Sequence, residues 1–499
     1  MADATEFKSY GVPVEITTTP DTVNISLDNL RRTFALTSDK LAELTPNKTP
    51  FFTYLAKMRN ESTTDPIFKK MEVRPQWQRR NFRCTTSEAV SSSNERFTFN
   101  VATNYTRTGR KTATYVNPAR FLLPEQVISL GPVTITNSDL NEPDTTPDIT
   151  AGTLNGTIFS VVHSSAYTTI VLTPLSTMTA GTSNTNTIWD DDGGAGYDTL
   201  STADSANASA TLGQVIGTAF DEGSTYPTSW HDDITSTEGY AQIFKTACPL
   251  FTGTSLATEY RAKSNEFMRV WDNKLNEHKM DIETAMMFGI GRVETASSQP
   301  VGDGGATGRR YTWGIIPYLN RFGFSDSSAD GNAFDASADG YDSFLDWMEE
   351  FTSPEDANDG SKLVLCSRKI LKYFNHLGDA GFLDNTLSNT NAGRSNADIQ
   401  NYDGAFGHAI TKVSTIFGDL HFMEHPLLRG NSDNLAAVVD LRDVKYRPLV
   451  GNGISRDTFI QTNVQNPGVD GRVDQIITEA GLEFCLPERS ALLRFTSLR

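Results

Sequence analysis

The clearest periodicity in the chain lies between residues 266 and 289, where apolar side chains recur every three or four positions. This spacing places them on one stripe of an α-helix. With Ser255 as a candidate N-cap, the pattern predicts one helix from Ser255 to Gly289, about 50 Å long at 1.5 Å per residue. The recurring positions are Phe267, Trp271, Leu275, His278, Ile282, Met286 and Gly289.

Residues 65–116 have a different pattern, rich in aromatic and β-branched side chains. A polar turn separates two such stretches, FKKMEVRPQWQRRNFRC and RFTFNVATNYTRTGRKTATYV. The pattern predicts two antiparallel arms of a long β ribbon. Because an isolated ribbon is only marginally stable in water, we expect it to lie on another surface.

The segment from about 131 to 238 is rich in Thr, Ser, Asn, Gly and Asp, and it contains short strand signals such as GTIFSVV and TTIVLTPL. We interpret it as an inserted β-rich domain. Disorder is the alternative, and the apolar runs argue against it. Residues 1–58 form an arm that includes a predicted short helix capped by Ser38.

After residue 240 the pattern alternates between helices and strands. Helices are predicted at YDSFLDWMEEF and RKILKYFNHLG. Strands are predicted at KLVLCS, AITKVSTIF, DLHFMEH, NLAAVVDL, DQIITEAGLEFC and ALLRFTSL. This mixture predicts an α+β fold.

Length and composition set broad limits on the fold. A chain of 499 residues exceeds what one hydrophobic core usually organises, so several compact units are expected. The chain shows no apolar run typical of a signal peptide or a membrane span. Its cysteines have no zinc-type spacing and are interpreted as buried free thiols, with disulfides the weaker alternative. They are Cys84, Cys248, Cys366 and Cys485.

The net charge of −18 is unevenly distributed. Residues 69–120 hold 11 basic and 3 acidic side chains, whereas residues 121–244 hold 15 acidic side chains and neither Lys nor Arg. A net acidic chain repels nucleic acid at long range, which argues against a DNA-binding protein. Adjacent blocks of opposite sign suit contacts between copies of one chain, and two solvated surfaces are the equally weighted alternative.

One stretch resembles an inverted zinc-protease motif, HxxEH, formed by His421, Glu424 and His425. That chemistry requires both histidines on one helical turn. The flanking VSTIFGDLHFM predicts a strand, and residues four apart in a strand are about 13 Å apart, too far to share one zinc ion. Glu277, Asp281 and Glu283 gather beside His278, and they are interpreted as the flanks of a structural helix rather than as a metal or acid/base site.

Two acidic loops raise the question of calcium. The pattern Asp335, Ser337, Asp339, Gly340 and Asp346 partly matches a calcium-binding loop, but position 8 is Asp342 and no helix is predicted before it. A polar loop that caps the next helix is favoured, and 190–194 (DDDGG) is read in the same way. GDGGATGRR lacks phosphate-loop spacing. The sequence therefore predicts no catalytic, cofactor-binding or metal site.

Several stretches resemble one family. They are FDEGSTYP, EGYAQIFKT, TGTSLAT, NEHKMDIETAMMFG and EAGLEFCLPERSALLRF. These motifs, and the order of the predicted elements, are similar to Hong Kong 97-like major capsid proteins of tailed bacteriophages, in a subfamily with a small inserted β domain.

The resemblance implies a division of the chain into parts. These are an N-terminal arm (1–58), an E-loop ribbon (59–130), the inserted acidic β-rich domain (131–238), a peripheral domain (239–362) with spine helix 255–289, an axial domain (363–440), and C-terminal strands (441–499) that return to the peripheral and axial domains.

The resemblance also implies a function. Hexamers and pentamers of the chain would build an icosahedral head shell around double-stranded DNA, with a portal protein and possible scaffolding and decoration proteins as partners. The protein would be a non-enzymatic part of the virion, without cofactors or membrane contact, assembled in the host cytoplasm. The alternatives are a tail or baseplate protein, or a zinc-dependent hydrolase.

In such folds the E-loop lies across a neighbouring subunit. The basic residues of the ribbon would then meet acidic groups of that neighbour. The residues predicted to make this inter-subunit contact are Lys69, Lys70, Arg74, Arg79, Arg80 and Arg83.

Overall fold

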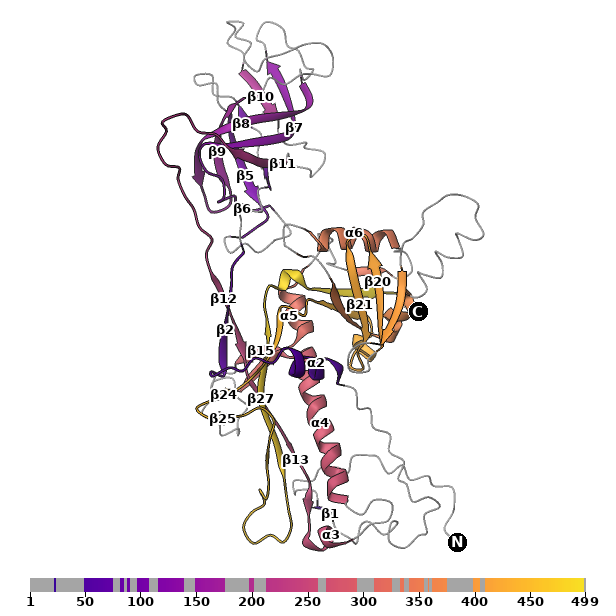
Figure 1. Ribbon diagram of the computed structural model, residues 1–499. Helices are drawn as coiled ribbons and strands as arrows, with labels where there is room; N and C mark the ends of the chain where they lie inside the picture. Colours follow the sequence, from indigo (N-terminus) through magenta and orange to yellow (C-terminus); the bar gives the residue numbers. More distant parts are fainter. Residues whose placement is uncertain are drawn as a thin grey trace, which may run out of the picture.

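The structure is a computed structural model (Figure 1). It describes residues 22–23, 49–74, 81–84, 88–89, 97–106, 115–138, 149–175, 197–201, 212–258, 266–293, 309–324, 333–335, 341–353, 358, 361–374, 398–403 and 409–497. Helices and β-sheets are both present, which confirms the predicted α+β class. No helix in the described part of the chain is long and apolar enough to cross a membrane.

The long helix is α4 (Glu266–Phe288). Ser255 does not cap it, so the predicted start was wrong. Ser255 lies inside a separate short helix, α3 (Gly253–Ala257), whose N-cap is Thr252 and whose C-cap Thr258 has extended backbone that ends the helix. The predicted apolar stripe is confirmed: Phe267, His278, Ile282 and Met286 are buried.

Helix α4 packs on a four-stranded sheet built around β27 (Gln475–Phe484), here called the β27 sheet. Three strands pair with β27, all antiparallel: β13 (Gln242–Ala247), β23 (Val444–Pro448) and β26 (Phe459–Gln461). Figure 1 shows α4 running alongside the long β13 and β27 strands.

A second sheet has seven described strands and lies beside the upper part of α4 in Figure 1. Their order is β17 (Ala333–Asp335), β28 (Ala491–Thr496), β22 (Leu435–Val439), β18 (Lys362–Cys366), β21 (Gly418–Glu424), β20 (Ala409–Thr415) and β19 (Asp398–Asp403). Helix α6 (Tyr341–Phe351) occupies the predicted stretch, and its Phe344 and Trp347 join the sheet's aromatic core. The strands predicted after residue 360 are confirmed.

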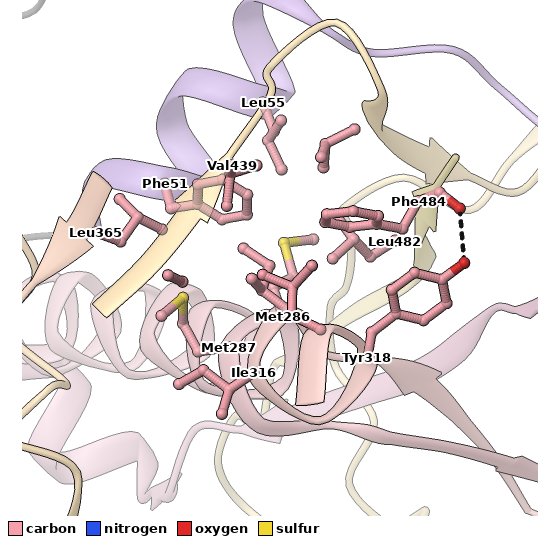
Figure 2. Close-up of a cluster of buried hydrophobic side chains, with 14 of the residues drawn as sticks. Phe51, Leu55, Met286, Met287, Ile316, Tyr318, Leu365, Val439, Leu482 and Phe484 are labelled. Carbon is pink, nitrogen blue, oxygen red and sulfur yellow. Dashed lines mark hydrogen bonds between the residues drawn. The ribbon is translucent and has the colours of Figure 1, made fainter. Parts of the chain in front are cut away.

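The two sheets meet at a central core, shown in Figure 2. Helix α2 (Pro50–Met58) contributes Phe51 and Leu55, and helix α5 (Ile315–Phe322) contributes Ile316 and Tyr318. Both helices pack against α4. The core therefore joins a segment from the start of the chain to strands from its end.

The inserted region is a nine-stranded antiparallel sheet. Six of its described strands form a closed ring, because β11 (Leu212–Thr218) pairs with both β3 (Asn81–Cys84) and β7 (Gln126–Ser138). The ring is completed by β5 (Phe97–Thr103), β8 (Ile149–His163) and β9 (Thr168–Pro174). The remaining strands are β4 (Glu88–Ala89), β6 (Asn117–Pro118) and β10 (Tyr197–Ser201).

The strand pairing differs from the ribbon expected over 65–116. Strands β3 and β5 do pair, but they belong to the closed sheet, so this sheet begins before residue 131. The reason is burial: Phe82, Cys84, Phe99 and Val101 are completely buried in its core. Closure of a sheet also protects strand edges from pairing with other chains. The ribbon is instead formed by β2 (Ile67–Glu72) and β12 (Thr235–Tyr240).

Shorter elements complete the subunit. They are β1 (Thr22–Val23), β14 (Leu250–Phe251), β15 (Ile290–Val293), β16 (Arg310–Trp313), β24 (Val450–Gly451), β25 (Ile454–Ser455), η4 (Gly430–Ser432) and η5 (Pro487–Arg489). The arm is represented by β1, which pairs in parallel with β14, and by α2. The predicted helix capped by Ser38 lies outside the described residues.

The four cysteines are free thiols, as predicted. Three are buried, and Cys485 is half-buried. Burial raises the pKa of Cys84 to about 12 and, together with the nearby Glu483, raises that of Cys485 to about 12. These thiols are therefore protonated and unreactive near neutral pH.

Candidate assembly site

Two of the residues predicted to make the inter-subunit contact, Lys69 and Lys70, lie on strand β2 of the β2–β12 ribbon. Strand β2 alternates strictly between exposed and buried positions. Successive side chains of a strand point to opposite faces, so Ile67, Lys69 and Met71 lie on the exposed face of the ribbon. Phe68, Lys70 and Glu72 lie on its buried face, together with the residues of β12 that pair with them.

Phe68 packs the buried face of the ribbon against the β27 sheet. Its cross-strand partner is Gly239, where a Cβ atom would come within 2.2 Å of the Phe68 ring. On the other side, a Cβ atom at Gly481 of β27 would lie 3.0 Å from the same ring. The two glycines thus admit Phe68 between the ribbon and the β27 sheet.

Lys70 is turned inward and is only 4% exposed. Its Nζ donates to the Tyr318 hydroxyl at 3.3 Å and lies 4.8 Å from the centre of the Tyr318 ring. Burial lowers the pKa of Lys70. Within this chain, Lys70 therefore contributes to the attachment of the ribbon rather than to its exposed face.

Arg74 is also buried. It follows β2 at the end of the ribbon where Glu72 pairs with Thr235, here called the base of the ribbon. Its guanidinium donates to Glu488 at 3.0 and 2.9 Å and to Glu72 at 2.8 Å. Glu72 in turn accepts the backbone N–H of Leu486 at 3.1 Å, and Leu486 has a left-handed backbone with φ of 42°. Burial disfavours the charge of Arg74, but Glu488 and Glu72 outweigh this effect and raise its pKa.

The other predicted contact residues are placed differently. Lys69 has a side chain 62% exposed, and its Nζ is 3.8 Å from Glu238 on the paired strand. Arg83 lies on β3, with its guanidinium 4.2 Å from the centre of the Tyr115 ring. Arg79 and Arg80 lie outside the described residues. The structure does not bring the four described residues, Lys69, Lys70, Arg74 and Arg83, together into one patch.

A cavity of about 310 Å³ lies under the base of the ribbon. Its walls come from the ribbon, from α5 and from the turn before β28. The lining residues are Glu72, Arg74, Thr235, Ser236, Thr237, Tyr318, Phe322 and Pro487. The sequence pattern did not indicate Tyr318, Glu488 and Glu72 as partners of the basic ribbon. The alternation along β2 was nevertheless a signal that Phe68, Lys70 and Glu72 share one buried face.

The zinc-protease motif lies on a strand, as predicted. His421 and Glu424 belong to β21, and His425 follows it. Glu424 accepts from Arg368 at 2.6 Å, whereas His425 lies 2.8 Å from Glu283 of α4. Glu424 and His425 thus take part in different contacts. In the described residues, no three His, Cys, Asp or Glu side chains are placed to hold a metal ion.

The polar residues of α4 are separated in the same way. Glu277 is exposed and pairs with Lys274 at 2.7 Å, and burial, followed by the charge of Glu277, raises the pKa of Asp281. His278 is buried between two strands of the β27 sheet: its Nδ1 lies 2.9 Å from the Thr246 hydroxyl and its Nε2 lies 2.8 Å from the Thr478 hydroxyl. The helix is structural here, and His278 joins it to the sheet.

The calcium-loop hypothesis is only partly covered by the structure. Asp335 ends β17 and Asp346 lies exposed on α6, whereas residues 336–340 lie outside the described residues. The same is true of the 190–194 segment and of GDGGATGRR up to residue 308.

Comparison with known proteins decides the family. A profile of the SU10 major capsid protein family matches residues 18–497, nearly the whole chain. The chain belongs to the SU10 major capsid protein family. This confirms the predicted kinship with phage major capsid proteins, and the family indicates a structural role.

A curated relative is the major capsid protein of Pseudomonas phage PaMx41. It is 24% identical over 293 residues, which are 56% of this chain and 64% of the relative. The chain thus spans just under two thirds of that relative's length.

Two solved phage structures show some similarity to this chain. The cyanophage A-1(L) capsid asymmetric unit has 10% identity and a TM-score of 0.35, and the match covers 56% of this chain and 82% of that chain. A Mycobacterium phage Patience chain has 12% identity and a TM-score of 0.33, and the match covers 56% and 78%.

The base of the ribbon generates a stability prediction. Replacing Arg74 with Ala leaves the buried Glu72 and the half-buried Glu488 without this cation, and breaking a buried pair costs about 3–5 kcal/mol. Urea unfolding of the subunit should show this loss. The matched control Lys69→Ala removes an exposed charge and should change stability by less than about 1 kcal/mol. Equal effects of the two changes would contradict the placement of Arg74.

His278 generates a pH prediction. Burial lowers its pKa below the ordinary value of 6.5, so the folded state binds fewer protons than the unfolded state. The stability that comes from neutral His278 is present above about pH 6.5 and is lost as the pH falls through the folded pKa.

The urea midpoint of the wild type should therefore fall more between pH 7 and pH 5 than that of His278→Gln, which keeps hydrogen-bonding groups but does not titrate. His231→Gln is the control, because the His231 side chain is 91% exposed. If His278→Gln and the wild type have parallel pH profiles, His278 does not contribute in this way.

Proposed function

We propose that this chain is the major capsid protein of a tailed phage and that its copies assemble as hexamers and pentamers into an icosahedral shell around double-stranded DNA. The observation that carries the proposal is the family match over residues 18–497. The net charge of −18 is compatible with a wall that does not hold its DNA tightly, because phosphates are repelled by an acidic surface.

The proposed architecture is the Hong Kong 97-like one. Helix α4 would be the spine of the peripheral domain, together with the β27 sheet that it covers. The seven-stranded sheet would be the axial domain, and the β2–β12 ribbon would be the base of the E-loop that leads to the closed inserted sheet. The ribbon's extension away from both sheets in Figure 1 supports this assignment.

The proposed partners follow from the same role. They are other copies of the chain, a portal protein, and scaffolding or decoration proteins. The protein would be located in the virion shell after assembly in the host cytoplasm, with no catalytic activity of its own.

The inter-subunit contact is proposed for the outward face of the ribbon. Met71 is 73% exposed and Ile67 is 39% exposed, and Lys69 lies between them on the same face. We infer that a neighbouring copy of the chain covers these two apolar side chains, which this chain leaves exposed. Lys70 and Arg74 are buried against partners within the chain, so the charge contribution is proposed for the other four predicted residues, Lys69, Arg79, Arg80 and Arg83.

Negative-stain microscopy of the expressed protein, alone and with neighbouring phage genes, tests the function. Closed shells of uniform size are expected. Rings or tubes alone, even with a scaffold present, would favour a tail protein. Stoichiometric zinc that is lost in His421→Ala would favour a hydrolase.

Charge reversal tests the ribbon contact in the same assay. Arg79→Glu combined with Arg80→Glu should reduce shell yield and heat resistance while the subunit still folds. Each exposed pair contributes only about 0–1 kcal/mol, so the effect depends on repetition across the shell. Arg79→Lys with Arg80→Lys retains the charge and should assemble normally. Normal shells from the reversed variant would refute the contact.

A further inference from the structure

The N-terminus of helix α2 lacks the usual local cap. Its N-cap residue, Thr49, makes no side-chain capping bond, and Pro50 has no N–H to donate. The next two backbone N–H groups, of Phe51 and Phe52, donate instead to Glu283 of α4, at 3.0 Å to Oε1 and 2.5 Å to Oε2. The cap of this helix therefore comes from a residue more than 230 positions away in the sequence.

His425 completes the coordination of Glu283. The backbone N–H of Leu427 donates to His425 Nδ1 at 3.3 Å, so this nitrogen is an acceptor and carries no proton. The proton is then on Nε2, which donates to Glu283 Oε1 at 2.8 Å. His425 is neutral in this arrangement, and its orientation is set by the backbone after β21.

The carboxylate has only donors around it. Its three described partners are two helix N–H groups and one imidazole N–H, and both the Glu283 and His425 side chains are 0% exposed. The negative charge lies at the positive end of the α2 dipole, which stabilises it. A neutral or misplaced side chain at this position would leave buried N–H groups without acceptors.

These contacts join three elements that are far apart in the sequence: helix α2, helix α4 and the end of β21. Figure 2 shows Phe51 and Leu55 of α2 in one core with Met286 of α4 and Val439 of the seven-stranded sheet. The backbone of His425 donates to Cys366 of β18, which is part of that sheet. Glu283 can therefore cap α2 only when α4 and the end of β21 have this mutual position.

The other end of α2 is attached independently. Tyr446 of β23 donates its N–H to Arg59 and accepts the N–H of Glu61. Loss of the Glu283 contacts would consequently free the start of the helix, while the connection of its other end to the β27 sheet stays in place.

We propose that Glu283, oriented by His425, is a latch that holds the start of α2 in the subunit and couples its docking to the placement of the seven-stranded sheet against α4. The latch is a property of the single chain and stands whether or not the chain builds shells. Glu283 is a positioning residue: it favours the subunit conformation in which α2 is docked against α4.

Hydrogen exchange measured by mass spectrometry on the full chain tests the latch. Glu283→Gln keeps the shape but places an amide N–H₂ against a donor. Hydrogen bonds to charged groups contribute about 1.5–3 kcal/mol, so exchange in residues 50–58 should accelerate about 10- to 100-fold. The Gln carbonyl oxygen can still accept from Phe51 and His425 at the Oε1 position, so the N–H₂ faces the Phe52 N–H. Exchange at 423–428 should therefore change less than exchange in 50–58, and β13 and β27 should keep their wild-type rates.

Two controls separate the latch from a general loss of stability. Glu277→Gln changes an exposed carboxylate on the same helix and should leave every segment unchanged. At position 425, His425→Leu removes the donor and should accelerate exchange in 50–58, whereas His425→Gln can place an N–H near the Nε2 position and should restore much of the protection. This pair decides the question if Glu283→Gln does not fold.

Two results would overturn the proposal. One is exchange of residues 50–58 in Glu283→Gln within about twofold of the wild type. The other is an equal acceleration in β13, β27 and 50–58, which would mean that Glu283 supports the whole fold and does not act as a latch.

Discussion

Strand β27 is buried along nearly its whole length on both faces, and the arrangement of the subunit follows from this constraint. A strand buried on both faces must find partners for its polar side chains as well as its apolar ones. Thr478 meets His278 of α4 and Thr458, Glu479 pairs with Arg310 and Arg456, and Glu483 pairs with Arg447. The helix, the β15–β16 hairpin and the C-terminal loops are therefore all held against one strand.

The same principle extends to the other junctions of the subunit. At the ribbon base, Arg74 is enclosed by Glu72 and Glu488, and in the seven-stranded sheet Lys362 donates to Asp440 at 2.6 Å with both side chains buried. At the arm, Glu283 caps α2. Charges at these positions add little net stability compared with apolar packing, but removal of one partner is costly, so they favour one relative placement of the parts. In the proposed shell, a subunit that must fit a repeated lattice would need such a single placement.

This internal use of charge limits what is available for assembly. Of the basic residues on β2 and just after it, Lys70 and Arg74 are engaged within the chain, and Lys69 is exposed. The outward face of the ribbon is then a mixture of one cation and the apolar Ile67 and Met71. Contacts between copies through this face would be less sensitive to salt than a purely ionic contact, because apolar burial is not screened.

The sequence by itself determined those features that depend on local periodicity and composition. The stripe from Phe267 to Met286, helix α6, the strands after residue 360 and the buried thiols could all be predicted, because side-chain spacing decides which face of an element is buried. The family could be recognised for a related reason: its motifs are local stretches. Only the tertiary structure decided which strands pair, that α3 and α4 are separate helices, and which partners Lys70, Arg74, His278 and Glu283 have. Those partners lie up to 414 positions away in the chain, and no periodic pattern encodes a contact at that separation.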